Sequence, residues 1–122
     1  MLIHGFPPAA KLPGDGRAGD RFWYWRGASG RNYIHSIYGP ETCPPLPGAV
    51  YVVVRKLGPL RIAIATGRFS PVWDGPLDLA DYTGADEIHV HLLARDEANA
   101  EAIFHDLEVA LEDRDQPSRA AA

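Results

Sequence analysis

The sequence has a single cysteine in 122 residues, so it can form no internal disulfide and no zinc site built on several cysteines. No apolar run approaches the roughly 20 residues that a membrane-spanning helix needs. The first residues contain no apolar stretch behind a basic one, and we therefore expect no secretory signal peptide. Together these absences predict a cytoplasmic protein that does not insert into a membrane.

A large excess of one charge is also missing, because the net charge is only −4. This value hides an asymmetry. Residues 1–70 carry nine basic and three acidic side chains, whereas residues 71–122 carry three basic and thirteen acidic ones. Two interpretations are open. Either the two halves neutralise each other in the fold, or the first half gathers into a basic face that could attract nucleic acid.

The length fits one domain, and 46% hydrophobic with 23% charged residues is ordinary for a globular protein. Residues 1–20 are rich in proline and glycine and have no periodic apolar face, which predicts a flexible arm. Residues 113–122 are polar and alanine-rich, which predicts a disordered tail. We therefore expect a single α+β domain over residues 21–112.

An aromatic β-hairpin is predicted near the start of this domain. Four consecutive aromatic residues at 22–25 and the segment 32–38 flank a turn that contains two glycines. Alternation along a strand places Trp23 and Trp25 on one face, with Phe22 and Tyr24 on the other. The tryptophan face offers more apolar area, so we expect it to be turned toward the sheet or a partner.

Three further strands are predicted. Residues 50–54 are apolar on both faces, which is typical of a central strand. Residues 61–65 follow a short turn and should pair with that strand in antiparallel fashion. Residues 87–93 alternate in polarity, and their expected core face consists of Ile88, Val90 and Leu92.

A helix over residues 97–112 is predicted by an apolar stripe and by Asp96, which is a suitable N-cap. The stripe consists of Ile103, Leu107, Ala110 and Leu111. A short helix over residues 77–82 is a weaker expectation. The sequence therefore predicts an α+β fold: a small, mostly antiparallel sheet with an N-terminal aromatic β-hairpin and a C-terminal helix.

The aromatic hairpin is the most distinctive candidate for binding. Its candidate residues are Trp23, Trp25, Arg26, Arg31 and Tyr33. Aromatic side chains among arginines can pack into a core, anchor a protein interface, or stack on bases while the arginines contact phosphates. All three interpretations stay open at this point.

His89 and His91 are candidate metal ligands, because an H-x-H pair on a strand places both imidazoles on one face. Glu87 shares this face, and His105 on the predicted helix could approach it. The alternative interpretation is a polar face of the sheet, since two ligands are too few for a metal site.

A family resemblance rests on the segments Gly48–Tyr51 and Ala65–Arg68, which stand in consecutive predicted strands. This arrangement resembles the core of the GIY-YIG nuclease superfamily. The later strand at 87–93 and helix at 96–111 follow in the order of that family. The resemblance covers residues 47–111 and implies a nuclease-like core.

The resemblance implies that active members use two tyrosines, an arginine on a helix and a metal-binding glutamate. The first tyrosine matches Tyr51, but the second falls at Ala65 and the glutamate near Phe104. Arg68 stands too early to be the helix arginine. We therefore expect a non-catalytic interaction domain without a cofactor, whose partner is a protein or a second copy of the chain rather than nucleic acid.

The alternative is a divergent nuclease in which a divalent metal is held by a rebuilt site. The candidate residues for that site are Tyr51, Arg68, His89 or His91, and Glu101 or Glu108. In this interpretation the metal offsets developing charge and the arginine steadies a phosphate.

Overall fold

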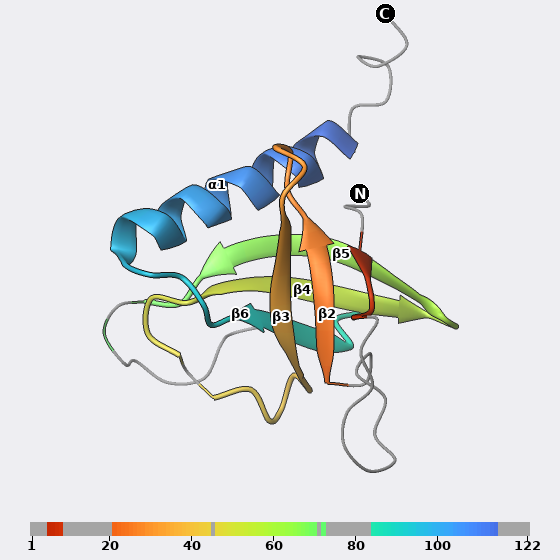
Figure 1. Ribbon diagram of the computed structural model, residues 1–122. Helices are drawn as coiled ribbons and strands as arrows, with labels where there is room; N and C mark the ends of the chain where they lie inside the picture. The colour runs from red at the N-terminus through yellow and green to blue at the C-terminus, as the bar shows by residue number, and fades with distance from the viewer. Residues whose placement is uncertain (1–4, 9–20, 45, 71, 73–83, 115–122) are drawn as a thin grey trace, which may run out of the picture.

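The computed structural model of the protein describes residues 5–8, 21–44, 46–70, 72 and 84–114. In these residues the chain forms one six-stranded sheet with a helix across one face, which confirms the expected α+β fold (Figure 1). The elements in chain order are β1 (Gly5–Phe6), β2 (Phe22–Arg26), β3 (Asn32–Tyr38), β4 (Val50–Leu57), β5 (Leu60–Arg68), β6 (Glu87–His91) and α1 (Glu97–Arg114).

The sheet has the strand order β1-β2-β3-β6-β4-β5, and every neighbouring pair is antiparallel. The pairs β2–β3 and β4–β5 are the two hairpins predicted from the turn signals, and both are confirmed. β6 is the last strand in the chain, yet it lies between the hairpins. It is therefore the strand that joins them into one sheet.

A β-bulge interrupts the pairing of β4 with β5. Val53 pairs with Ala65 and Val54 pairs with Ala63, so Ile64 is the extra residue. A bulge increases the local right-handed twist of a sheet. In Figure 1, β2 and β3 cross the direction of β4 and β5 steeply. The loop that connects β2 to β3 reaches α1.

β4 is the two-sided strand that the sequence predicts. All five residues from Val50 to Val54 are buried. Val52 belongs to the core between the sheet and α1, whereas Val53 belongs to a second core on the opposite face. Because both faces of this strand are covered, its sequence is apolar at every position rather than at every second one.

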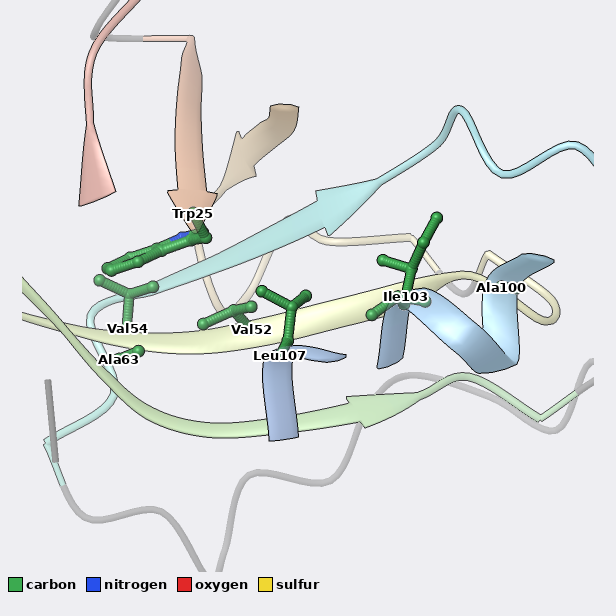
Figure 2. Packing of buried hydrophobic residues seen from close by; sticks show 8 residues of the cluster. Trp25, Val52, Val54, Ala63, Ala100, Ile103 and Leu107 are labelled. Carbon is green, nitrogen blue, oxygen red and sulfur yellow. The ribbon is translucent and has the colours of Figure 1, made fainter. Parts of the chain in front are cut away.

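α1 packs on the sheet along the predicted apolar stripe. Its core contacts come from Ala100, Ile103 and Leu107, which lie against β4 and β5 (Figure 2). The carboxylate of Asp96 accepts a hydrogen bond of 2.8 Å from the backbone N–H of Asn99, which confirms the predicted N-cap. The helix continues to Arg114, so residues 113 and 114 are helical rather than part of the expected tail, and residues 115–122 lie outside the described residues.

Trp25 is the largest fully buried side chain of the structure's described residues, and its exposed fraction is 0%. It lies in the core with Val54 and Ala63, beneath α1 (Figure 2). Trp23 packs on the same core, whereas Tyr24 on the other face stacks on a ring of β1. The predicted division of the hairpin into two faces is confirmed.

The expectation of a flexible arm over residues 1–20 is wrong in one respect. Gly5 and Phe6 form β1 at the edge of the sheet, where the Phe6 ring stacks on Tyr24 at 5.2 Å between centroids. A side chain at Gly5 would meet the Trp25 ring at 2.7 Å, so only glycine fits there. The short helix expected over residues 77–82 lies outside the described residues.

Replacing Trp25 with alanine should lower the free energy of unfolding by about 3–5 kcal/mol, as large core truncations do. The reason is the loss of a fully buried ring and of its hydrogen bond to β6. Urea unfolding followed by circular dichroism measures the change. Leu57→Ala, at a side chain that is 46% exposed, is the control and should cost less than about 0.5 kcal/mol. A Trp25→Ala loss as small as that of the control would contradict the buried position of the ring.

Candidate functional site

A chain of buried polar groups crosses the sheet under α1. The indole Nε1–H of Trp25 donates to Nδ1 of His89 at 2.9 Å. An indole nitrogen only donates, so Nδ1 is unprotonated and the ring carries its proton on Nε2. That Nε2–H donates to Glu87 Oε1 at 2.9 Å, and Glu87 also accepts from Arg61 at 2.7 Å. The guanidinium of Arg61 lies 4.5 Å from the centre of the Trp23 ring.

The pKa values of this network follow from its hydrogen bonds. Burial raises the pKa of Glu87, but the hydrogen bonds from His89 and Arg61 outweigh it and set the pKa at about 2. Burial lowers the pKa of His89, against the opposing effect of Glu87. A proton on Nδ1 would also face the Trp25 N–H, so His89 stays neutral in the folded protein. Both of its nitrogens are occupied, which leaves no lone pair for a metal.

Two more histidines lie beside this network, on β3 and β6. The ring centroids of His35 and His91 are 5.5 Å apart. Nδ1–H of His35 donates to the Tyr33 carbonyl at 2.8 Å, and its buried Nε2 has no partner among the described residues. Nδ1–H of His91 donates to the Ile34 carbonyl at 2.7 Å. Burial lowers the pKa of His35 well below its ordinary value, and the two other histidines lower it further.

His89 and His91 lie on β6 two residues apart, as the predicted polar face requires, and both rings are buried. Side chains of the hairpin cover them: the Trp25 ring packs on His89, and the Tyr33 ring packs on His91. His105, which was expected to approach them, is exposed on α1. Among the described residues, no group of three or more His, Cys, Asp or Glu side chains could hold a metal ion.

A cavity of about 360 Å³ lies at one end of the sheet, where β4 starts, β5 and β6 end and α1 begins. This region is at the left of Figure 1. We call it the end cavity. Its polar lining consists of Arg68, His91, Asp96 and Glu97, and its apolar lining includes Leu46, Ala49, Leu92 and Ala100.

Arg68 is held from three sides at this cavity. Its guanidinium donates to both carboxylate oxygens of Glu97, at 2.5 and 2.8 Å, and to Glu101 at 2.9 Å. Nε and Nη2 also donate to the Gly48 carbonyl, at 3.1 and 2.6 Å. The hydrogen bond to Glu97 is the main reason why the pKa of Arg68 is raised, and it lowers the pKa of Glu97. Every nitrogen of the guanidinium therefore has a partner within the protein.

The remaining nuclease candidates do not join this cluster. Tyr51 lies on the opposite face of β4, where its ring packs on Phe69 at 5.0 Å between centroids. Glu108 stands seven residues beyond Glu101 on α1, which is about 10 Å along a helix axis. The structure thus brings Arg68, His91 and Glu101 to one end of the sheet, and separates Tyr51 and Glu108 from them.

The hairpin candidates are also divided. Trp25 is fully buried and Trp23 partly so, whereas Arg26 and Arg31 are exposed. The Tyr33 hydroxyl donates to the carboxylate of Asp106 on α1, and burial together with this bond raises the pKa of Tyr33. The five residues therefore form no single exposed binding surface.

Asp106 is the residue that sequence reasoning missed. Its carboxylate accepts hydrogen bonds from the Ser29 hydroxyl at 2.6 Å, the Ser29 N–H at 2.8 Å and the Tyr33 hydroxyl at 2.8 Å. The Ala28 N–H donates to its backbone carbonyl at 3.0 Å. These bonds fix the hairpin loop on α1. The sequence does place this carboxylate next to Leu107, at the border of the buried stripe, and that position could have indicated a contact with another element.

Comparisons with known proteins give no relative: no family model matches the chain, and neither does any curated protein or solved structure. In the part of the chain that the structure describes, no helix is long and apolar enough to cross a membrane. The site must therefore be interpreted from its own chemistry.

The free energy of unfolding should decrease as the pH falls below about 6.5. The reason is that His35 and His89 are neutral in the folded protein and gain protons on unfolding. Their contribution is complete above the ordinary pKa of 6.5 and is lost as the pH falls toward the lowered folded values. Glu87 adds a second loss between its ordinary value of 4.5 and about 2.

Urea unfolding at about pH 7.5, 6.5 and 5.5 measures this dependence. His35→Phe should flatten the slope between the upper and lower pH, whereas His105→Gln, at an exposed position, should leave it unchanged. Equal stability of the unmodified protein at all three values would show that the buried histidines take up protons without unfolding.

Proposed function

We propose that the chain is a non-catalytic binding domain on a degenerate GIY-YIG-like core, with the end cavity as its binding site. The observation that carries the proposal is the saturation of Arg68 by Glu97, Glu101 and the Gly48 carbonyl. An arginine that steadies a phosphate must have donors to offer. Here the carboxylates already take them, and they would repel a phosphate as well.

The position of Tyr51 also supports a binding role. It is the one tyrosine that the resemblance carries over, and its ring is on the face opposite to Arg68. A nucleophile-activating hydroxyl and a phosphate-binding guanidinium on opposite faces of one sheet cannot act on the same bond. The separation of Tyr51 from Arg68 therefore favours binding over cleavage.

Nucleic acid is not the partner that the hairpin favours. Base stacking requires an exposed aromatic face, and Trp25 has none. Cys43 is a free, buried thiol, and burial raises its pKa to about 11, so the thiol is unreactive. A free thiol is also consistent with the cytoplasmic location that we propose. The proposal therefore places recognition at a cavity rather than at a basic surface.

The alternative, a divergent metal-dependent nuclease, would use the same cavity, because Arg68 and His91 both line it. Incubation of the purified protein with plasmid and single-stranded substrates in magnesium or manganese separates the two functions. We expect no cleavage. Cleavage that persists in the purified protein and disappears in Tyr51→Phe would establish the nuclease and overturn the binding proposal.

A second measurement tests the saturation of Arg68 directly. Glu97→Gln with Glu101→Gln keeps the shape of both side chains and removes both charges. The double variant should bind inorganic phosphate at least about tenfold more tightly than the unmodified protein, since two like-charge repulsions are removed and donors are released. Glu108→Gln on the same helix is the matched control and should change nothing. Equal phosphate binding by all three proteins would mean that Arg68 is not what excludes a phosphate.

A further inference from the structure

His91 offers an unused hydrogen-bond acceptor in the end cavity. Its Nδ1–H donates to the Ile34 carbonyl at 2.7 Å, so in the neutral ring Nε2 carries the lone pair. Among the described residues nothing donates to this nitrogen. The side chain is only 6% exposed, and it lines the cavity. This nitrogen is not among the buried polar atoms that lack a partner, so solvent reaches it, and a donor on a ligand in the cavity can replace that solvent.

The surroundings of that nitrogen limit what can approach it. Leu46, Ala49, Leu92 and Ala100 supply apolar walls, and a volume of about 360 Å³ is in the range of small-molecule sites. Among the residues that the structure describes, no carboxylate forms a hydrogen bond with His91. Between these walls a charged group would lose its hydration at a large cost, whereas a neutral hydroxyl or N–H loses less and regains a hydrogen bond at Nε2. The inner part of the cavity therefore suits an apolar group that ends in a neutral donor.

The outer part of the cavity has the opposite preference. Asp96 and Glu97 line it from exposed positions, and the charge of Arg68 is already shared by Glu97 and Glu101. The ionisable side chains of the lining, Arg68, Asp96 and Glu97, leave an excess of one negative charge. A positively charged group at the mouth would be attracted, and an anion would be repelled.

We propose that the end cavity binds a small molecule with an apolar body, a neutral hydroxyl or N–H donor at its inner end and a cationic amine at its outer end. The inner donor bonds to Nε2 of His91, and the amine lies near Asp96 and Glu97. This inference rests on the proposed function, because it names the ligand class of the same binding site.

Three related compounds test the three parts of this ligand. Tyramine has a phenol hydroxyl, a ring and an ethylammonium group. Phenethylamine lacks only the hydroxyl, and 3-(4-hydroxyphenyl)propionate replaces the cation with an anion. Each is titrated into the full chain at about pH 8, and the ring nitrogens of ¹⁵N-histidine-labelled protein are followed by NMR.

Tyramine should produce a saturable shift at Nε2 of His91. Phenethylamine should bind about 3- to 10-fold more weakly, the equivalent of one hydrogen bond. The propionate should also bind more weakly than tyramine, and added salt should reduce the difference between their affinities. In His91→Phe, tyramine and phenethylamine should bind equally, whereas His105→Phe, at an exposed site on α1, should keep the preference.

The comparison of ligands on the unmodified protein decides the matter even if His91→Phe does not fold. Equal affinity for tyramine and phenethylamine, tighter binding of the propionate, or no saturable shift at His91 up to about 10 mM would each overturn the proposal. Cleavage of nucleic acid together with the expected tyramine preference would support this ligand class while overturning the non-catalytic function, so the two failures are distinguishable.

Discussion

The hydrogen bond from Trp25 to His89 joins residues that are 64 positions apart in the sequence, and it sets which nitrogen of His89 carries the proton. Because the indole can only donate, the imidazole must accept at Nδ1, donate from Nε2, and find an acceptor in Glu87. The carboxylate then needs a counter-charge, which Arg61 supplies. One buried donor thus fixes the direction of the hydrogen bonds from His89 to Glu87 on β6. Removal of any member would leave a buried partner unsatisfied.

The charge asymmetry of the sequence is resolved by pairing across the fold. Arg61 and Arg68 come from the basic half, and their carboxylate partners Glu87, Glu97 and Glu101 come from the acidic half. This supports the interpretation in which the halves neutralise each other. The pairing also has a chemical consequence, because a guanidinium that is held by carboxylates attracts no phosphate. The same contacts that hold β5 to α1 and β6 therefore decide what the cavity can recognise.

The two polar regions beneath α1 differ in whether both nitrogens of their histidine are hydrogen-bonded. In the network around His89, every nitrogen of the imidazole is paired, and the network serves the fold. At the end cavity, His91 has one nitrogen bound to the backbone and one that is not used within the described residues. Two histidines separated by a single residue on one strand thus have different roles. The difference comes from their surroundings: the Trp25 indole of β2 reaches His89 across β3, whereas His91 is the last residue of β6 and lines the end cavity.

Sequence alone determined the local elements: both hairpins, the two-sided strand β4, the strand β6, and a helix capped by Asp96. These depend on alternation, turn residues and caps, which act over a few positions. Only the tertiary structure decided that β6 inserts between the hairpins, because strand order depends on long-range pairing that no local pattern encodes. That insertion buried His89 and His91, brought His91 to Arg68, and left Tyr51 on the other face. The elements were therefore readable from the sequence, whereas the site was not, because its residues meet only after β6 takes its place.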